Sequence, residues 1–126
     1  MQPPLLQSVL HLQKPLQKPL VERVLQFGQG NFLRSFCGWM FSEMNQKLET
    51  DFGIVMVQPI ADGNIEAFDA QQCCYTVCLQ GYQEGKPSKS NYLCRAVTRG
   101  LNPFTRYNDF LALAHQPHLE YVISNT

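Results

Sequence analysis

The stretch that most constrains this chain runs from Val24 to Arg34 and reads VLQFGQGNFLR. A short apolar run leads into two glycines one residue apart, and an amphipathic segment follows directly. This order predicts a strand, a tight turn and a helix, with Gly28 in the turn and Gly30 open to a ligand. The first amides of such a helix face an anion with the positive end of the helix dipole behind them. The segment therefore predicts a pyrophosphate site.

The glycine pattern by itself leaves a second interpretation open. The usual dinucleotide fingerprint has a third glycine, and Leu33 stands where it would fall. A Gly-x-Gly pair also occurs in strand-to-helix turns that bind nothing. The strand pattern before the glycines and the helix pattern after them favour nucleotide binding over a purely structural turn.

The composition predicts one globular domain with a modest core. The chain has 126 residues, of which 44% are hydrophobic and 16% are charged, and these values argue against disorder. Ten basic and ten acidic residues cancel, so no basic excess favours binding to nucleic acid or to a membrane surface. The chain has neither a membrane-spanning run nor a secretory signal pattern, so we expect a cytoplasmic protein.

The cysteines predict no metal site and no disulfide framework. They are odd in number, five, and we expect reduced, half-buried thiols. The residues that suggest a four-sulfur site lack the Cys-x-x-Cys spacing of such sites, and two of them are adjacent. These residues are Cys73, Cys74, Cys78 and Cys94.

The chain divides into a leader and a folded part. Residues 1–20 are rich in Gln, Leu and Pro, and their prolines break regular structure, so we expect a flexible leader. A short docking segment is the alternative. From residue 21 on, strand 23–27, helix 31–48 and strand 54–57 form one strand–helix–strand unit. The second strand is a continuous apolar run, as in buried parallel sheets.

The end of the second strand bears on cofactor choice. Nucleotide folds often place Asp or Glu there to hold the adenosine ribose, and this chain has Gln58, whose carboxamide can also bond a ribose diol. No Lys or Arg lies between Lys47 and Lys86. The sequence therefore favours NAD, because this region offers no cation for the 2′-phosphate of NADP.

The second half of the chain predicts an inserted hairpin and then a further helix and strand. Residues 75–80 and 92–98 alternate polar and apolar side chains around a turn at 84–87. Asn102 is expected to cap a helix with Pro103 in its first turn, and Pro117 is expected to end it. Residues 119–124 read as a strand. Because ligands of open α/β sheets bind beyond such strand ends, we expect the chain to be a fragment.

Several segments together resemble the polyol-specific long-chain dehydrogenase family, which includes mannitol dehydrogenase. Residues 22–34 (ERVLQFGQGNFLR) resemble its N-terminal signature in the form found in the altronate oxidoreductase (tagaturonate reductase) branch. Residues 55–60 resemble its second strand, residues 98–104 its pre-helix segment, and residues 122–126 the strand that leads to its cofactor loop. The resemblance covers about residues 22–126 and preserves order and spacing.

The resemblance implies an NAD-dependent oxidoreductase that interconverts D-altronate and D-tagaturonate in hexuronate catabolism. Residues 21–126 would be the N-terminal part of a Rossmann-like NAD-binding domain, an α/β fold with a mostly parallel sheet and an inserted β-hairpin. In the family a largely helical C-terminal domain follows, hydride transfer needs no metal, and the catalytic lysine lies in that later domain. No catalytic residue therefore transfers to this chain, and we expect the chain alone to be inactive.

The resemblance assigns cofactor-binding positions. The turn and helix start would present the pyrophosphate site, Gln58 would lie near the adenosine ribose, and the last residues would lie under the nicotinamide half. These positions are Gly28, Gly30, Asn31, Phe32, Gln58, Ser124, Asn125 and Thr126. Arg34 either approaches the phosphates or pairs with a carboxylate as a structural clamp. Arg99 is a weaker phosphate candidate, with a surface salt bridge as its alternative.

Two other functions remain open from the sequence. One is a free-standing NAD(H)-binding module without catalytic activity. The wide apolar helix face argues against it, because an uncovered face of this kind promotes aggregation. The other is an S-adenosylmethionine enzyme, which also uses a glycine turn after its first strand. Such enzymes usually need an acidic residue at the second strand end, and Gln58 counts against this interpretation.

Overall fold

A parallel sheet of four strands forms the centre of the fold in the computed structural model, which describes residues 18–125. The strand order is β5-β2-β1-β6, and each neighbouring pair is parallel. The strands are β1 (Val21–Phe27), β2 (Phe52–Val57), β5 (Val97–Leu101) and β6 (Tyr121–Ser124). From β1 the chain adds β2 and then β5 on one side of the sheet. It then returns and adds β6 on the other side of β1. This order confirms the predicted Rossmann-like α/β class.

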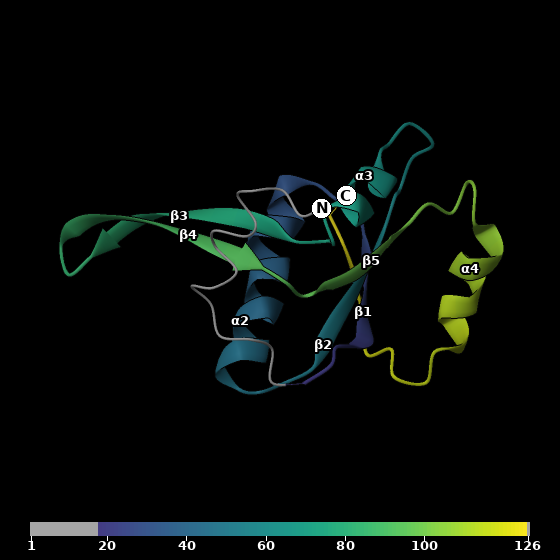
Figure 1. The fold of residues 1–126 in the computed structure, drawn as a ribbon, viewed down its shortest axis with the longest axis horizontal. Coiled ribbons are helices and arrows are strands. Elements are labelled where there is room, and N and C mark those ends of the chain that lie inside the picture. Colours follow the sequence, from purple (N-terminus) through teal and green to yellow (C-terminus); the bar gives the residue numbers. More distant parts are fainter. Residues whose placement is uncertain (1–17, 126) are drawn as a thin grey trace.

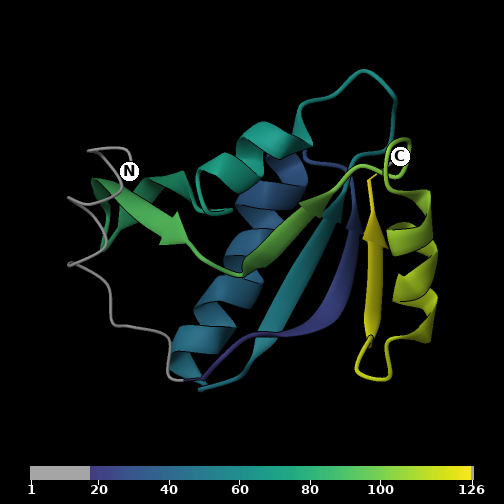
Figure 2. The same cartoon turned by 45° about the vertical axis from the view of Figure 1, so that its right-hand side comes forward.

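Helices cover both faces of the sheet (Figures 1 and 2). On one face lie the helix that follows β1, made of η1 (Leu33–Gly38) and α2 (Trp39–Lys47), and the short α3 (Ile65–Ala70). On the other face lies α4 (Tyr107–Ala112), continued by the 3₁₀ turn η2 (Leu113–His115). The three-layer arrangement buries the central strands on both sides, as parallel sheets require.

Alternation along the central strands divides the core into two clusters. Val24, Ile54 and Met56 are fully buried and belong to the cluster on the α2 and α3 side. Val55 and Val57 point the other way and pack with Leu113 near α4. Because successive side chains of a strand face opposite sides, the uninterrupted apolar run of β2 supplies both clusters.

The helix predicted over residues 31–48 is confirmed in its extent, from Asn31 to Lys47, but its first part is irregular. Residues 33–38 form a π-helical segment, in which the backbone bonds span five residues instead of four. A spacing of three and four between apolar residues does not distinguish such a segment from an α-helix. No sequence pattern predicts a helix over residues 65–70, which form α3.

The inserted antiparallel hairpin is confirmed, but its second strand lies earlier in the chain than predicted. The hairpin consists of β3 (Tyr75–Gln83) and β4 (Lys86–Cys94), and it projects away from the sheet (Figure 1). The predicted strand over 92–98 is wrong, because the chain leaves the hairpin after Cys94. It then enters β5, where Val97 pairs with Ile54 of the parallel sheet. The alternating pattern of residues 92–98 extends from β4 into β5, so it does not reveal that the chain changes sheets.

The predicted start of the following helix is also wrong. The side-chain Oδ1 of Asn102 accepts a hydrogen bond from the backbone N–H of Phe104 at 3.0 Å, and the backbone O of Asn102 accepts from Arg106 N at 2.9 Å. These bonds close a turn, and α4 begins only at Tyr107. The predicted end is confirmed, because the helical segment stops at His115, before Pro117.

The leader predicted over residues 1–20 falls almost entirely on residues 1–17, which lie outside the described part of the chain. Lys18 to Leu20 form no helix or strand and lead directly into β1. Within residues 18–125, every helix is too short or too polar to span a lipid bilayer.

Arg23 joins three segments at the amino end of the sheet. Its Nε lies 2.7 Å from Asp51 Oδ1, just before β2, and its Nη1 lies 2.8 Å from Glu120 Oε1, just before β6. The hydrogen bond from Arg23 lowers the pKa of Asp51 below its ordinary value of 3.8. The pair therefore favours the charged carboxylate in the folded state.

We expect this pair to make stability fall on acidification. The unfolded chain binds a proton at Asp51 more readily than the folded chain, so the stabilisation is present above the ordinary pKa of 3.8. It is lost as the pH falls through the lowered pKa. Urea unfolding measures the free energy of unfolding at neutral pH and at about pH 3. This free energy should fall less on acidification in D51N than in the unchanged chain. The control is D109N, which removes the exposed Arg106–Asp109 pair of α4. Its free energy of unfolding should fall on acidification by as much as that of the unchanged chain.

Candidate dinucleotide site

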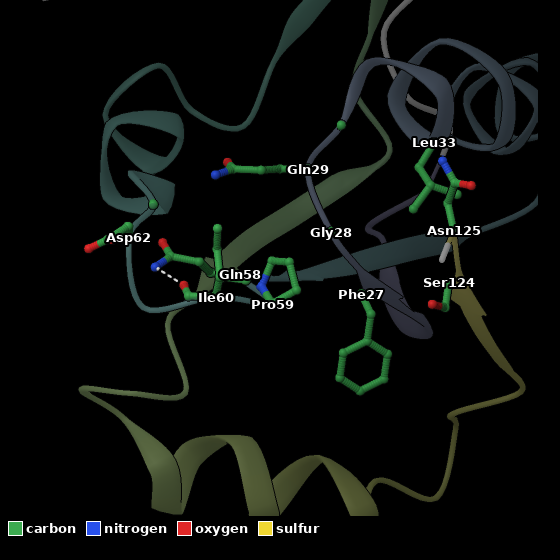
Figure 3. A pocket seen from close by; sticks show the side chains of 12 residues that line it. Phe27, Gly28, Gln29, Leu33, Gln58, Pro59, Ile60, Asp62, Ser124 and Asn125 are labelled. Carbon is green, nitrogen blue, oxygen red and sulfur yellow. Dashed lines mark hydrogen bonds between the residues drawn. The ribbon is translucent and has the colours of Figure 1, made fainter.

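A pocket of about 520 Å³ lies at the carboxyl ends of β1, β2 and β6 (Figure 3). Its wall comes from the turn after β1, the loop after β2 and the end of β6. The lining residues are Phe27, Gly28, Gln29, Gly30, Leu33, Gln58, Pro59, Ile60, Asp62, Gly63, Ser124 and Asn125. The strand order reverses between β1 and β6, and open α/β sheets bind ligands at such a reversal. The volume is in the range of small-molecule sites.

The glycine turn forms the middle of the pocket. Gly28 has φ +107°, a conformation that residues with a side chain rarely adopt. Its N–H donates to Val57 O at 2.9 Å, and its carbonyl accepts from Gln26 Nε2 at 2.9 Å. Gln26 is fully buried in β1. The turn is thus held from two strands, and the polar Gln26 in an apolar strand was the overlooked sequence signal for this contact.

The helix that follows the turn begins beside the pocket, and the space next to the Gly30 backbone is empty. A Cβ atom added to Gly30 would meet nothing within 4 Å, so a ligand can approach this peptide closely. Asn31 and Phe32 are exposed and lie outside the pocket wall. Phe32 stacks on Phe36, with 5.5 Å between ring centroids. The structure therefore brings the two glycines into the pocket and leaves these two predicted residues at its rim.

Gln58 lines the pocket, but its carboxamide is used by its own loop. Its Nε2 donates to Ile60 O at 2.8 Å and to Ala61 O at 3.1 Å, and its Oε1 accepts from Ile65 N at 3.2 Å. The side chain is fully buried. A Cβ atom at Gly63 would overlap this carboxamide, so Gly63 allows the loop to close around it. Gln58 thereby shapes the loop between β2 and α3.

Asp62 is the one charged residue among those that line the pocket in the described chain, and it is not among the cofactor-binding residues predicted from the sequence. It lies in the loop after β2, on the same side of the pocket as Gln58 (Figure 3). The side chain is exposed, and in this view its carboxylate points away from Gln29. An acidic residue just before a glycine after the second strand was the signal available in the sequence.

The opposite side of the pocket belongs to β6. Ser124 and Asn125 line it, across the glycine turn from Gln58 and Asp62 (Figure 3). Both were predicted as cofactor-binding positions and both lie at the predicted strand end. Thr126, the third predicted residue of this group, lies outside the described residues.

The two arginines considered for the phosphates have other contacts in this structure. Arg34 Nη2 donates to Asn31 Oδ1 at 2.8 Å, and its guanidinium lies 5.7 Å from the centroid of the Tyr75 ring. Within residues 18–125 it forms no ion pair with a carboxylate. Arg99 makes a two-pronged bond to Glu22, at 2.8 and 3.1 Å, as the surface salt-bridge alternative predicted.

The buried thiols offer no reactive group. Burial, followed by a hydrogen bond to Asp69, raises the pKa of Cys73 to about 12, and burial raises the pKa of Cys94 to about 12. Both remain protonated at neutral pH and are therefore poor nucleophiles and poor metal ligands. Over residues 18–125, no three His, Cys, Asp or Glu side chains gather as a metal site.

The family model described as the mannitol dehydrogenase Rossmann domain matches residues 22–125. The chain belongs to this family. The match thus covers nearly all of the described chain, including the sheet from the second residue of β1 onward and the whole pocket. The resemblance inferred from the glycine turn and the three later segments is confirmed at the level of the family.

Relatives of this mannitol dehydrogenase Rossmann domain include altronate oxidoreductases. The altronate oxidoreductase of Phocaeicola vulgatus is 43% identical over 110 residues, which are 87% of this chain and 22% of that protein. The altronate oxidoreductase of Pectobacterium carotovorum is 41% identical over 106 residues, 83% of this chain and 22% of that protein. The chain therefore spans 22% of the length of each of these two relatives.

Two solved structures share the fold. Mannitol 2-dehydrogenase of Pseudomonas fluorescens, solved as a ternary complex with NAD and D-mannitol, superposes with a TM-score of 0.74 at 14% identity. The match covers 89% of this chain and 23% of that one. A D-sorbitol dehydrogenase in substrate-free form gives a TM-score of 0.69 at 21% identity, over 84% of this chain and 22% of that one. At these identities the likeness concerns the fold.

Proposed function

We propose that the pocket binds NAD. The pyrophosphate would lie over the turn from Gly28 to Gly30, the adenosine ribose toward the loop after β2, and the nicotinamide half toward Ser124 and Asn125. The observation that carries this proposal is the glycine turn at the reversal of strand order, with φ +107° at Gly28 and open space at Gly30. An extended dinucleotide needs a central cradle and a subsite on each side, and the pocket wall has these three parts.

Asp62 is proposed as the residue that selects NAD over NADP. A carboxylate accepts hydrogen bonds from the two ribose hydroxyls, whereas it repels a 2′-phosphate. Rotation of its exposed side chain would bring the carboxylate to the pocket. Gln58, which the sequence suggested for the ribose, would act by holding the loop in shape. Asn31 and Phe32 would contribute backbone N–H groups at the helix start, where an anion is favoured.

The activity proposed for the whole protein is the NAD-dependent interconversion of D-altronate and D-tagaturonate. The support is the set of relatives named altronate oxidoreductase at 37–43% identity. When bound, the nicotinamide ring supplies the hydride acceptor or donor. This chain's residues would hold and orient the dinucleotide, while the sugar acid and the proton-transferring groups would be held by a further, largely helical domain. We propose that the chain alone is inactive and that the protein acts in the cytoplasm.

Titration of the 126-residue chain with NAD and with NADP tests the proposal. We expect the unchanged chain to bind NAD more tightly than NADP. D62N should weaken NAD binding by about tenfold and bring the two affinities close together, because it removes the bonds to the ribose diol and the repulsion of the 2′-phosphate. Isothermal titration calorimetry measures both effects.

The matched control is E84Q, which removes one negative charge at the tip of the hairpin. It should leave both affinities unchanged, since it lies outside the pocket wall. Failure of the unchanged chain to bind NAD would refute the proposed site, and an E84Q effect equal to that of D62N would refute the role of Asp62. The chain mixed with D-altronate and NAD should produce no NADH.

A further inference from the structure

The irregular start of the helix after the glycine turn is held by a residue from the hairpin. The hydroxyl of Tyr75, at the start of β3, donates to the backbone carbonyl of Arg34 at 2.8 Å. The two residues lie 41 positions apart in the chain. Arg34 lies within the π-helical segment η1, where the wider turn displaces carbonyls from their α-helical positions. The hydroxyl therefore bonds the helix at the place where its backbone departs from regular geometry.

Gly38, the last residue of η1, makes room for this contact. A Cβ atom at position 38 would overlap the Tyr75 hydroxyl, and its next neighbours would be Tyr75 Cζ at 3.4 Å and Leu33 O at 3.5 Å. Only the hydroxyl is thus incompatible with a side chain at this position. Gly38 has an ordinary helical φ of −62°, so the glycine is needed for this close approach and not for its backbone conformation.

Arg34 connects this bond to the glycine turn. Its backbone N–H donates to Gly30 O at 3.2 Å, and its Nη2 donates to Asn31 Oδ1 at 2.8 Å. Its guanidinium lies 5.7 Å from the centroid of the Tyr75 ring, within the distance of a cation–π contact. Tyr75 thus holds Arg34 by both its hydroxyl and its ring, and Arg34 in turn holds the first residues of the helix.

We propose that Tyr75, accommodated by Gly38, is a positioning residue that sets the pyrophosphate cradle of the proposed NAD site through Arg34. The inference rests on the proposed function, because it concerns how that site obtains its geometry. The cradle depends on the direction of the amides at Gly30 and Asn31, and a small displacement of such donors is costly for a bound anion. The loop after β2, which would hold the adenosine, is supported separately by Gln58.

The hydroxyl is suited to a permanent structural role. Tyr75 is 9% exposed, and burial raises its pKa above the ordinary value. The hydroxyl therefore stays protonated and able to donate at physiological pH, so the contact does not depend on pH there. The ring packs on Phe68 of α3, with 5.8 Å between centroids, and this packing fixes its direction.

The test compares variants in binding of ADP-ribose and of adenosine to the 126-residue chain. Y75F retains the ring and removes the hydroxyl, and it should weaken ADP-ribose binding by about tenfold while adenosine binding stays unchanged. G38A should have the same effect, because its methyl group displaces the hydroxyl. The double variant G38A/Y75F should be no weaker than Y75F, since the hydroxyl is then absent and the methyl group fits.

The control is Y92F. Tyr92 lies on the other strand of the same hairpin, and its hydroxyl donates to Ser42 Oγ on α2 at 3.2 Å, away from the turn. Y92F removes a half-buried tyrosine hydroxyl bonded to the same long helix and should leave ADP-ribose binding unchanged. Thermal unfolding of every variant verifies that each is folded at the temperature of the titration.

The outcomes separate the two proposals. Binding of ADP-ribose by Y75F with unchanged affinity, or an equal loss for adenosine and ADP-ribose, would overturn the positioning role and leave the NAD site standing. Additive losses in the double variant would also overturn it. If the unchanged chain binds neither ADP-ribose nor NAD, the proposed function is overturned, and the positioning role with it.

Discussion

Replacement of Gly28 by alanine should weaken NAD binding by about a hundredfold, equivalent to about 2.7 kcal/mol. Space is not the obstacle, because an added Cβ atom would lie 3.8 Å from Leu33 Cδ1. The obstacle is φ of +107°, which costs a residue with a side chain about 1–3 kcal/mol. The turn relieves this strain only by changing shape, and the amides then no longer converge on the pyrophosphate.

Gly30 provides the matched comparison for this prediction. Its φ is not positive, and a Cβ atom there would meet nothing within 4 Å of the folded protein. G30A should therefore keep its unfolding free energy within about 0.5 kcal/mol. Its methyl group would occupy the space beside the turn where the proposed pyrophosphate would lie, so NAD binding should still weaken by about tenfold or more.

Urea unfolding together with NAD titration checks both variants. G28A should lose stability and affinity, whereas G30A should lose affinity alone. A G28A chain that binds NAD as tightly as the unchanged chain would contradict the pyrophosphate assignment. A G30A chain that loses as much stability as G28A would show that Gly30 serves the fold and not the ligand.

Replacement of Gln58 by leucine is expected to lower stability by about 2–4 kcal/mol. Leucine fills similar space but leaves the carbonyls of Ile60 and Ala61 and the N–H of Ile65 without their side-chain partner. Ile65 is buried, so its N–H then carries the full cost of its lost hydration, and the two carbonyls, which belong to exposed residues, lose the net contribution of their hydrogen bonds. The melting temperature should fall by about 10 °C or more, as measured by differential scanning calorimetry.

The same variant separates two roles for Gln58. A direct ribose ligand, as the sequence suggested, would lower NAD affinity on replacement while the melting temperature stayed the same. A loop-shaping residue lowers both, because the loop that carries Asp62 loses its support. Q29L is the control: Gln29 extends into the same pocket from the glycine turn (Figure 3), and its replacement should leave the melting temperature unchanged.

Local sequence patterns predicted the frame of the site with good accuracy. The glycine turn, the long helix, the buried second strand and the last strand all occur where the patterns placed them. Each is a local property, since φ preference, apolar periodicity and strand length are encoded by neighbouring residues. The two glycines and the end of β6 line the pocket as expected.

The errors arose where a residue's partners lie elsewhere in the chain. Alternation through residues 92–98 continued while the chain passed from the hairpin to the parallel sheet, because alternation is the same in both. Asn102 and Pro103 matched a helix start, but the bonds of Asn102 close a turn instead. The π-helical segment is bonded by Tyr75 from a distant strand, and no pattern within the helix reports this contact.

The sequence by itself determined the family, the parallel α/β class and the position of the glycine turn, because these follow from contiguous motifs. The tertiary structure decided which side chains are available to a ligand. It buries the carboxamide of Gln58 in its own loop, brings Asp62 to the pocket wall, and engages Arg34 with Asn31 and Tyr75. Availability depends on hydrogen bonds formed after folding, and residue type alone does not specify them.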